Sequence, residues 1–484
     1  MLIVHPACHY QTMDELNWLN ATTQVDLLKS RQVSAVELMS SCYDQIERCN
    51  PQLNALVNVL PREKALALAA ASDECKAENQ GPLHGLPIAP KDMLDAEGLP
   101  TTFGFVPYAD RIARSDSTLI ARQRLAGAIV IGKSNMPEFG LGSNTFNALF
   151  GATRNPYDLD KTPGGSSGGA AAALASGMLS ITDGSDMGGS LRNPASFCNV
   201  VGFRPSIGRV PDDRGFGWFG RLATAGPMAR TVADAALLFS VQAGPSPHDP
   251  LTLPEDGARF REPLAVDLTG MKFGVTSDLG LIPVDSEVAS IVESAVTVFA
   301  DLGGTLTREC PDFSDAMDIF QTQRAASLAV TGRILEQTLP DWRAHAKDTA
   351  IWNIERGFAL TADEVIRSEL RRTELYRRVS RFFEQHDALL LPAAQVPPFD
   401  SSLEWIREIN GQPMPTYIDW MTVCCAISVT GLPAISVPAG FTDSGLPVGL
   451  QIVGKPRGDF ELLQIAHAFE AATHFGMTRP EFAG

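Results

Sequence analysis

The residues best suited to chemistry are two serines that lie in glycine-rich clusters. Ser166 lies within the run from 164 to 169, together with Ser167, and Ser190 follows a pair of glycines at 188 and 189. Glycine allows backbone N–H groups to converge on a small space, so each hydroxyl could lie beside several donors. A hydroxyl nucleophile next to N–H groups that stabilise an oxyanion is what acyl transfer requires.

A serine nucleophile needs a base, and Lys91 is the best candidate in this sequence. The nearest histidines, His84 and His248, have no motif around them. The apolar run 86–89 is typical of a buried strand, and it would bring Lys91 into the interior. Lowering a lysine pKa from about 10.4 to about 7 requires roughly 4.6 kcal/mol, which is within the range of burial. We therefore expect Lys91 to act as a desolvated base.

The two serine clusters are connected by sequence that is typical of packed structure rather than of a flexible linker. Ala170 to Gly177 predicts a helix, and Leu179 to Thr182 predicts a short strand. The first cluster would then precede a helix N-terminus and the second would follow a strand end, where ligands bind in α/β sheets.

Three other motifs suggest different chemistry. The segment 127–134 fits the Walker A pattern, but its interior is typical of a strand, so Lys133 is interpreted as a structural residue at a strand end. The segment 164–168 fits the nucleophile elbow of α/β-hydrolases, but the late His467 lies within a predicted helix. His5 and His9 have i, i+4 spacing near the N-terminus, which is weak evidence for a metal site.

The chain resembles the amidase signature family, and the resemblance extends over nearly its whole length. The segments that carry it are 87–92 (PIAPKD), 132–138 (GKSNMPE), 151–156 (GATRNP), 163–169 (PGGSSGG), 188–195 (GGSLRNPA), 226–231 (GPMART), 430–434 (TGLPA) and 445–451 (GLPVGLQ). Ser190 follows Ser166 by 24 residues, as in that family.

The resemblance implies a Ser-cisSer-Lys triad. In it Ser190 is the acyl-enzyme nucleophile, Ser166 relays the proton from a cis peptide bond, and Lys91 is the terminal base. Ser167 would be a supporting residue. The backbone N–H groups of Met187, Gly188, Gly189 and Ser190 would form the oxyanion hole. No cofactor or metal is expected.

The implied activity is hydrolysis of a carboxylic amide C–N bond to an acid and an amine or ammonia. Met187 in the oxyanion loop favours an apolar or aryl acyl group. One alternative is the glutaminase-type subunit of a glutamyl-tRNA(Gln) amidotransferase, although that subunit typically has Thr at position 187 and Gln in place of Asn193. A carbamate or ester hydrolase with the same triad is another alternative.

The order of predicted elements indicates an α/β fold. We expect a single large domain with a mixed central β-sheet covered by α-helices on both faces. Helices are predicted at 13–30, 34–48, 61–76, 117–125, 232–243, 286–302, 362–386 and 459–472. Strands are predicted at 53–59, 86–89, 128–131, 179–182, 272–275, 388–391, 434–437 and 448–453.

Within this domain, 1–484, the sequence suggests four parts. Residues 1–80 form an N-terminal helical segment and 81–245 the catalytic core. The resemblance implies that residues 313–385 are the variable helical region of the substrate pocket, and 386–484 return to the sheet.

Composition limits the partners. With 39 basic and 56 acidic residues, the chain has a formal charge of −17, which disfavours nucleic acid and anionic membranes. Without a signal peptide or long apolar run, the expected location is cytoplasmic. Eight scattered cysteines indicate reduced thiols. A small-molecule amide is the expected partner, and the resemblance allows a homodimer.

Overall fold

The structure is a computed structural model that describes residues 13–212 and 221–483. Its centre is an eight-stranded sheet with the order β11-β10-β12-β16-β15-β8-β9-β7. These strands are β7 (Ile181–Asp186), β8 (Val201–Arg204), β9 (Thr224–Ala229), β10 (Lys272–Val275), β11 (Thr305–Thr307), β12 (Ala388–Pro392), β15 (Ala434–Phe441) and β16 (Pro447–Gly454). β10 pairs in parallel with β11 and β12, and the other neighbours are antiparallel, so the predicted mixed sheet is confirmed.

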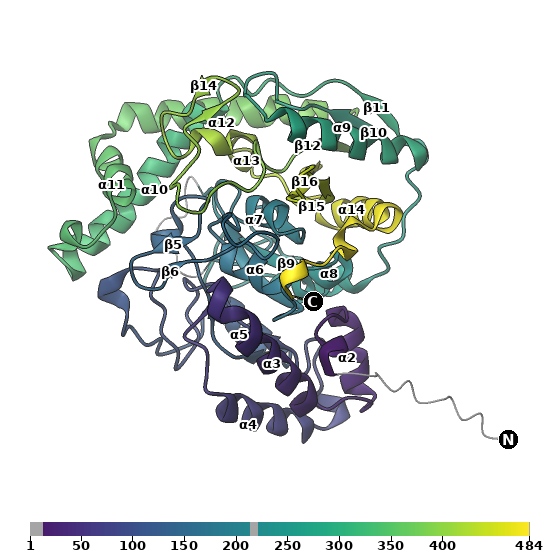
Figure 1. Cartoon of the computed structure of the whole chain (residues 1–484). Coiled ribbons are helices and arrows are strands. Elements are labelled where there is room, and N and C mark those ends of the chain that lie inside the picture. Colours follow the sequence, from purple (N-terminus) through teal and green to yellow (C-terminus); the bar gives the residue numbers. More distant parts are fainter. Residues whose placement is uncertain (1–12, 213–220, 484) are drawn as a thin grey trace.

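Helices cover both faces of this sheet (Figure 1). The longer ones are α2 (Ala21–Lys29), α3 (Ala35–Leu53), α4 (Arg62–Asp73), α5 (Thr118–Leu125), α6 (Gly168–Ala175), α8 (Val232–Gln242), α9 (Ser286–Asp301), α10 (Ala316–Thr338), α11 (Asp348–Ala359), α12 (Ala362–Phe382) and α14 (Asp459–Thr473). The shorter ones are α1 (Met13–Leu16), α7 (Arg192–Phe197) and α13 (Thr422–Ser428).

The alternation of side chains along β12 separates two apolar cores. Leu390 packs in the core that contains residues of α8, α9 and α14, whereas Leu389 and Leu391 pack in the core formed with α10, α12 and α13. Successive side chains of a strand point to opposite faces, so this assignment follows from the period of two. The predicted α/β architecture with helices on both faces is therefore confirmed.

Several predicted strands near the N-terminus are short and lie outside the central sheet. The additional strands are β1 (Leu56–Val57), β2 (Pro87–Ile88), β3 (Ile129–Val130), β4 (Lys133–Ser134), β5 (Phe146–Asn147), β6 (Gly151–Ala152), β13 (Glu408–Ile409) and β14 (Gln412–Pro413). They pair as β1-β4, β2-β3, β5-β6 and β13-β14. The prediction of a strand at 53–59 was wrong at its start, because α3 continues to Leu53 and buries Leu38, Cys42, Ile46 and Leu53 along one face.

The predicted first helix, 13–30, is also two helices. α2 begins after Asn20, which is extended, and the carboxylate of Asp234 accepts the backbone N–H groups of Ala21 and Thr22, both at 2.9 Å. A helix start needs acceptors for its free N–H groups, and here the acceptor comes from α8. A local pattern could not indicate this distant cap.

Two further findings concern the described residues. No helix among them is long and apolar enough to cross a membrane. No group of three or more potential metal-ligating side chains is found in residues 13–212 and 221–483. His5, His9 and Cys8 lie outside the described residues.

Candidate active site

Lys91 lies in the interior of the protein and contacts three serine hydroxyls. It follows β2, forms a bridge with Ser134 of β4, and its side chain is fully buried. Its Nζ lies 2.7 Å from Ser166 Oγ, 3.0 Å from Ser167 Oγ and 3.0 Å from Ser185 Oγ. The structure therefore brings together three residues named from the sequence, Lys91, Ser166 and Ser167. It adds Ser185, which sequence reasoning missed.

The segment that carries Ser166 is fixed by hydrogen bonds to its backbone. The Gly165–Ser166 peptide bond is cis. Ser143 Oγ donates to the carbonyl of Gly165 at 2.6 Å, and Thr145 Oγ1 accepts from the N–H of Gly168 at 3.2 Å. A Cβ on Gly168 would lie 2.3 Å from that Thr145 oxygen, so only glycine fits where this segment enters α6.

Strand β7 positions both Lys91 and the loop that carries Ser190. Asp183 Oδ1 accepts the backbone N–H of Lys91 at 3.0 Å, and Ser185, two residues further, binds the amine of the same lysine. Asp186 points to the opposite face, as strand alternation requires, and accepts N–H groups of the loop that follows. The predicted end of this strand at Thr182 was wrong, because the polar residues up to Asp186 all have hydrogen-bond partners in the interior.

Asp186 is the centre of a fully buried ionic network. Its carboxylate binds Arg192, whose Nε and Nη2 lie 3.0 and 2.9 Å from its oxygens, and Arg204 Nη1 lies 3.3 Å from Oδ1. All three side chains have no exposed surface. Burial alone would raise the pKa of Asp186, but the two guanidinium groups hold that pKa well below its usual range. The carboxylate therefore remains ionised.

The loop that carries Ser190 connects β7 to α7 and leaves the serine partly exposed. Gly189 has φ +115°, and its N–H donates to Asp186 Oδ1 at 2.9 Å. Within the described residues, the N–H groups of Met187, Gly188 and Ser190 have no acceptor. The structure therefore differs from the expectation at Gly189, whose N–H is already bound to a carboxylate at the strand end.

The segments that carry Ser190 and Ser166 are connected through Ser143 rather than by a direct hydrogen bond between the two serines. In the part of the chain that the structure describes, no hydrogen bond joins Ser190 directly to Ser166 or Lys91. Ser143 nevertheless spans the two loops, because its Oγ donates to Gly165 and accepts from Asn193 Nδ2 at 3.0 Å. Asn193 lies three residues after Ser190, so the Ser143 hydroxyl fixes the segment that carries Ser190 against the segment that carries Ser166.

Apolar side chains from the C-terminal half approach the second loop. A Cβ on Gly188 would lie 3.0 Å from both Phe320 Cζ of α10 and Cys425 Sγ of α13. The side chain of Met187 packs against the same cluster. The helical region expected to form a pocket wall thus contacts the candidate oxyanion loop at Phe320.

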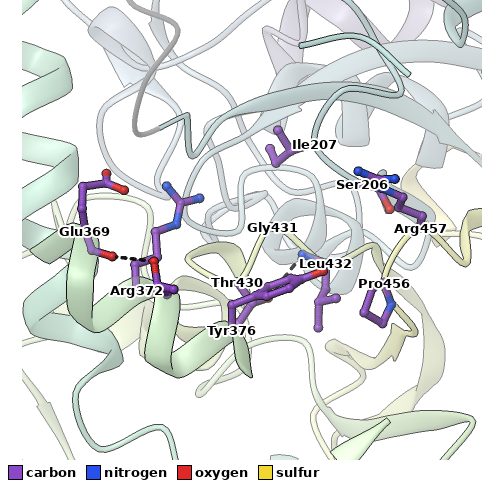
Figure 2. Close-up of a pocket in the computed structure, with 11 residues that line it drawn as sticks. Ser206, Ile207, Glu369, Arg372, Tyr376, Thr430, Gly431, Leu432, Pro456 and Arg457 are labelled. Atoms are coloured by element: carbon purple, nitrogen blue, oxygen red, sulfur yellow. Dashed lines mark hydrogen bonds between the residues drawn. The ribbon is translucent and has the colours of Figure 1, made fainter. Parts of the chain in front are cut away.

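A separate cavity lies away from these groups. Its volume is about 380 Å³, and Arg372 and Tyr376 of α12 line one side, while Gly431, Leu432 and Arg457 line the other (Figure 2). Neither the lysine nor the serines of the candidate site line it, so this cavity belongs to a different part of the molecule.

The competing motifs have structural explanations. Lys133 of β4 is buried, and its amine donates to the carbonyl of Leu94 and to Thr101 Oγ1. Burial lowers its pKa to about 8. The interior of the Walker-like segment is strand β3, as predicted, rather than a phosphate-binding loop. His467 lies within helix α14, also as predicted.

Comparison with known proteins identifies the class. The family model for Amidase matches residues 37–463. Because this match covers most of the chain, the protein belongs to the amidase family, whose members are hydrolases that act on amides.

Individual relatives cover almost the full length. The chain is 34% identical to an acylamidase of Rhodococcus erythropolis over 476 residues, which are 97% of this chain and 98% of that protein. It is also 34% identical to a glutamyl-tRNA(Gln) amidotransferase subunit from Carboxydothermus hydrogenoformans, over 96% of this chain and 100% of that one. The crystal structure of a bacterial aryl acylamidase of the amidase signature family matches with a TM-score of 0.87 at 30% identity, covering 96% of this chain and 100% of that chain.

Proposed function

We propose that this enzyme hydrolyses a linear carboxylic amide to an acid and an amine or ammonia through a serine acyl-enzyme. Ser190 is the nucleophile, Ser166 relays the proton, and Lys91 is the terminal base. The observation that carries the proposal is the 2.7 Å hydrogen bond between Lys91 Nζ and Ser166 Oγ in a fully buried setting. Burial disfavours the ammonium form, so a neutral amine can accept a proton there.

The proposed reaction has two acyl-transfer steps. Ser190 Oγ attacks the amide carbonyl, its proton passes to Ser166 Oγ, and the proton of Ser166 passes to Lys91 Nζ. The C–N bond then breaks as the relay returns a proton to the leaving nitrogen. Water attacks the resulting ester by the same proton path and releases the acid, so one water is consumed for each amide.

The N–H groups of Met187, Gly188 and Ser190 are the proposed oxyanion donors. They have no acceptor among the described residues, whereas the N–H of Gly189 donates a hydrogen bond to the carboxylate of Asp186. Fixed donors of this kind stabilise negative charge as it develops, and losing one typically reduces kcat about 10²–10³-fold.

The acyl group is proposed to be apolar or aryl. Met187, Phe320 and Cys425 surround the backbone at Gly188, and none of them offers a charged or strongly polar group. The relative from Rhodococcus erythropolis is an acylamidase, and the matching crystal structure is of an aryl acylamidase. We further propose that residues 313–385 form one wall of the pocket, since Phe320 belongs to that region.

The alternative of a glutaminase-type subunit is supported by the 34% identity to the amidotransferase protein from Carboxydothermus hydrogenoformans. Glutamine is therefore included in the test, together with carbamate and ester substrates, which suit the same triad. The expected result is that these compounds are poorer substrates than an apolar amide.

The experiment is hydrolysis of alkyl, aryl and carbamate amides, esters and glutamine by the wild type, Ser190→Ala and Lys91→Ala. Lys64→Ala serves as the matched lysine control, because Lys64 is exposed on α4. We expect cleavage of an apolar amide, with losses of at least 10³-fold in the first two variants and none in the control. Activity that persists in Ser190→Ala, or that is restricted to glutamine, would contradict the proposal.

A further inference from the structure

Ser185 is a third hydroxyl on the amine of Lys91, and it has a partner of its own. The residue lies near the end of β7, and its Oγ is 3.0 Å from Lys91 Nζ. The same oxygen lies 3.2 Å from the thioether sulfur of Met93, with the hydroxyl as the donor. A thioether sulfur can accept a hydrogen bond but has no proton to donate. The proton of Ser185 is therefore directed toward Met93 and away from the lysine.

The two serines other than Ser166 both act as acceptors from the amine. The Ser167 hydroxyl is placed to donate to the carbonyl of Ser185 at 3.5 Å, so its proton also points away from Lys91. Ser166 Oγ makes the shortest contact, at 2.7 Å. A neutral amine has two N–H donors and one lone pair. If the donors go to Ser167 and Ser185, the lone pair faces the hydroxyl of Ser166.

We propose that Ser185, with its proton held by Met93, is a positioning residue that directs the lone pair of Lys91 toward Ser166. This inference rests on the proposed triad and adds the device that orients its base. When the ammonium form loses a proton, the position left vacant is the one toward Ser166, because the other two hydroxyls have their protons committed elsewhere. Ser185 thus acts by orienting the amine of Lys91 and takes no part in the proton relay itself.

The other charged groups near the lysine come from three segments. Asp183 of β7 accepts the backbone N–H of Lys91, and Asp92 is its neighbour in the chain. Lys133 of β4 interacts electrostatically with both carboxylates. None of these groups changes in the variants below, so an altered pH profile reports on the hydroxyl itself.

The test compares Ser185→Ala, Ser185→Thr and Met93→Leu by the pH dependence of kcat and of kcat/KM on an amide that the wild type hydrolyses. In Ser185→Ala we expect kcat to fall about tenfold with KM unchanged within twofold. We also expect the acid limb of kcat/KM to move to lower pH, because the ammonium form loses an acceptor. A purely structural role would lower the melting temperature and leave this limb in place.

The other two variants separate the hydroxyl from its orientation. Ser185→Thr retains the hydroxyl and should remain within threefold of the wild type. Met93→Leu keeps a similar volume but removes the sulfur acceptor, so the freed Ser185 proton can compete for the lone pair of Lys91. We expect kcat to fall about threefold and the acid limb of kcat/KM to move to lower pH, as in Ser185→Ala.

Two outcomes would overturn the inference, and a third would overturn the triad instead. The first is a Ser185→Ala variant with the kcat of the wild type and an acid limb of kcat/KM that has not moved. The second is a Met93→Leu variant with an unchanged kcat and pH profile. Either result would show that Ser185 does not orient the base. Ser190→Ala is measured alongside. Full activity of that variant would instead refute the proposed function on which the inference depends.

Discussion

Replacing Asp186 by asparagine should both destabilise the protein and impair its activity. The substitution keeps the shape of the side chain but removes the negative charge that Arg192 and Arg204 share inside the protein. It also weakens the acceptor of the Gly189 and Leu191 N–H groups, at 2.9 and 3.1 Å, which hold the loop that carries Ser190.

The magnitude follows from the burial of the three groups. Removing one partner of a buried ion pair typically costs about 3–5 kcal/mol, because the remaining charge is left without compensation. Unfolding entropy of about 2.1 cal/mol/K per residue gives roughly 1 kcal/mol/K for a chain of 484 residues. The melting temperature of Asp186→Asn should therefore fall by about 3–5 °C.

The assay is differential scanning calorimetry at pH 7, with amide hydrolysis measured on the same samples. The matched control is Asp363→Asn, which removes the same charge from a surface pair with Arg367, whose side chains are 65% and 72% exposed. A pair of this kind contributes about 0.3–0.5 kcal/mol, so the control should lose less than about 1 °C. Equal melting temperatures for the two variants would refute the argument that Asp186 neutralises the buried arginines.

Three further predictions concern pH, pocket shape and the second buried lysine. Because the pKa of Asp186 is held below its usual value of 3.8, its stabilisation is present above that pH and is lost as the pH falls below about 4. The difference in melting temperature between wild type and Asp186→Asn should then narrow, and calorimetry that finds a constant difference would contradict this. Phe320→Ala should raise kcat/KM for bulky acyl groups about tenfold relative to acetyl, because the ring lies beside Gly188; an unchanged ratio would exclude Phe320 from the acyl pocket. Burial lowers the pKa of Lys133 to about 8 from 10.5, so between those pH values the unfolded chain binds the additional proton. Chemical denaturation should show wild-type stability rising relative to Lys133→Met over that interval, and parallel curves would argue against a buried amine.

The contact between Lys91 and Ser166 was more predictable than the contacts that support it. Glycine clusters around Ser166 and Ser190, and an apolar run before Lys91, are local patterns, and the structure places Lys91 against Ser166. The predicted strand ends at Thr182, whereas β7 continues through polar residues to Asp186, and polar residues are rarely buried without partners. Here the partners come from residues that are distant along the chain, such as Lys91, which lies 92 residues before Asp183.

The predicted boundaries of helices and strands were wrong where residues distant along the chain determine them. The helix break before Ala21 depends on Asp234, which lies 213 residues further along the chain. A local pattern contains no information about which carboxylate will accept an N–H group after folding. The family resemblance predicts an oxyanion hole at 187–190 but does not indicate that the N–H of Gly189 is already bound to Asp186.

The contacts of Arg192 connect the loop that carries Ser190 to residues that lie more than 200 positions further along the chain. Its Nη1 donates to Gln451 Oε1 at 2.5 Å, and its Nη2 donates to Ser428 Oγ at 2.6 Å. A nascent chain that still lacks β16 has all three proposed catalytic residues but not the acceptor that β16 supplies to this guanidinium. We therefore expect the loop that carries Ser190 to become ordered only after translation has passed residue 451 and that segment has left the ribosome. Hydrolytic activity would then first appear only after that point in synthesis.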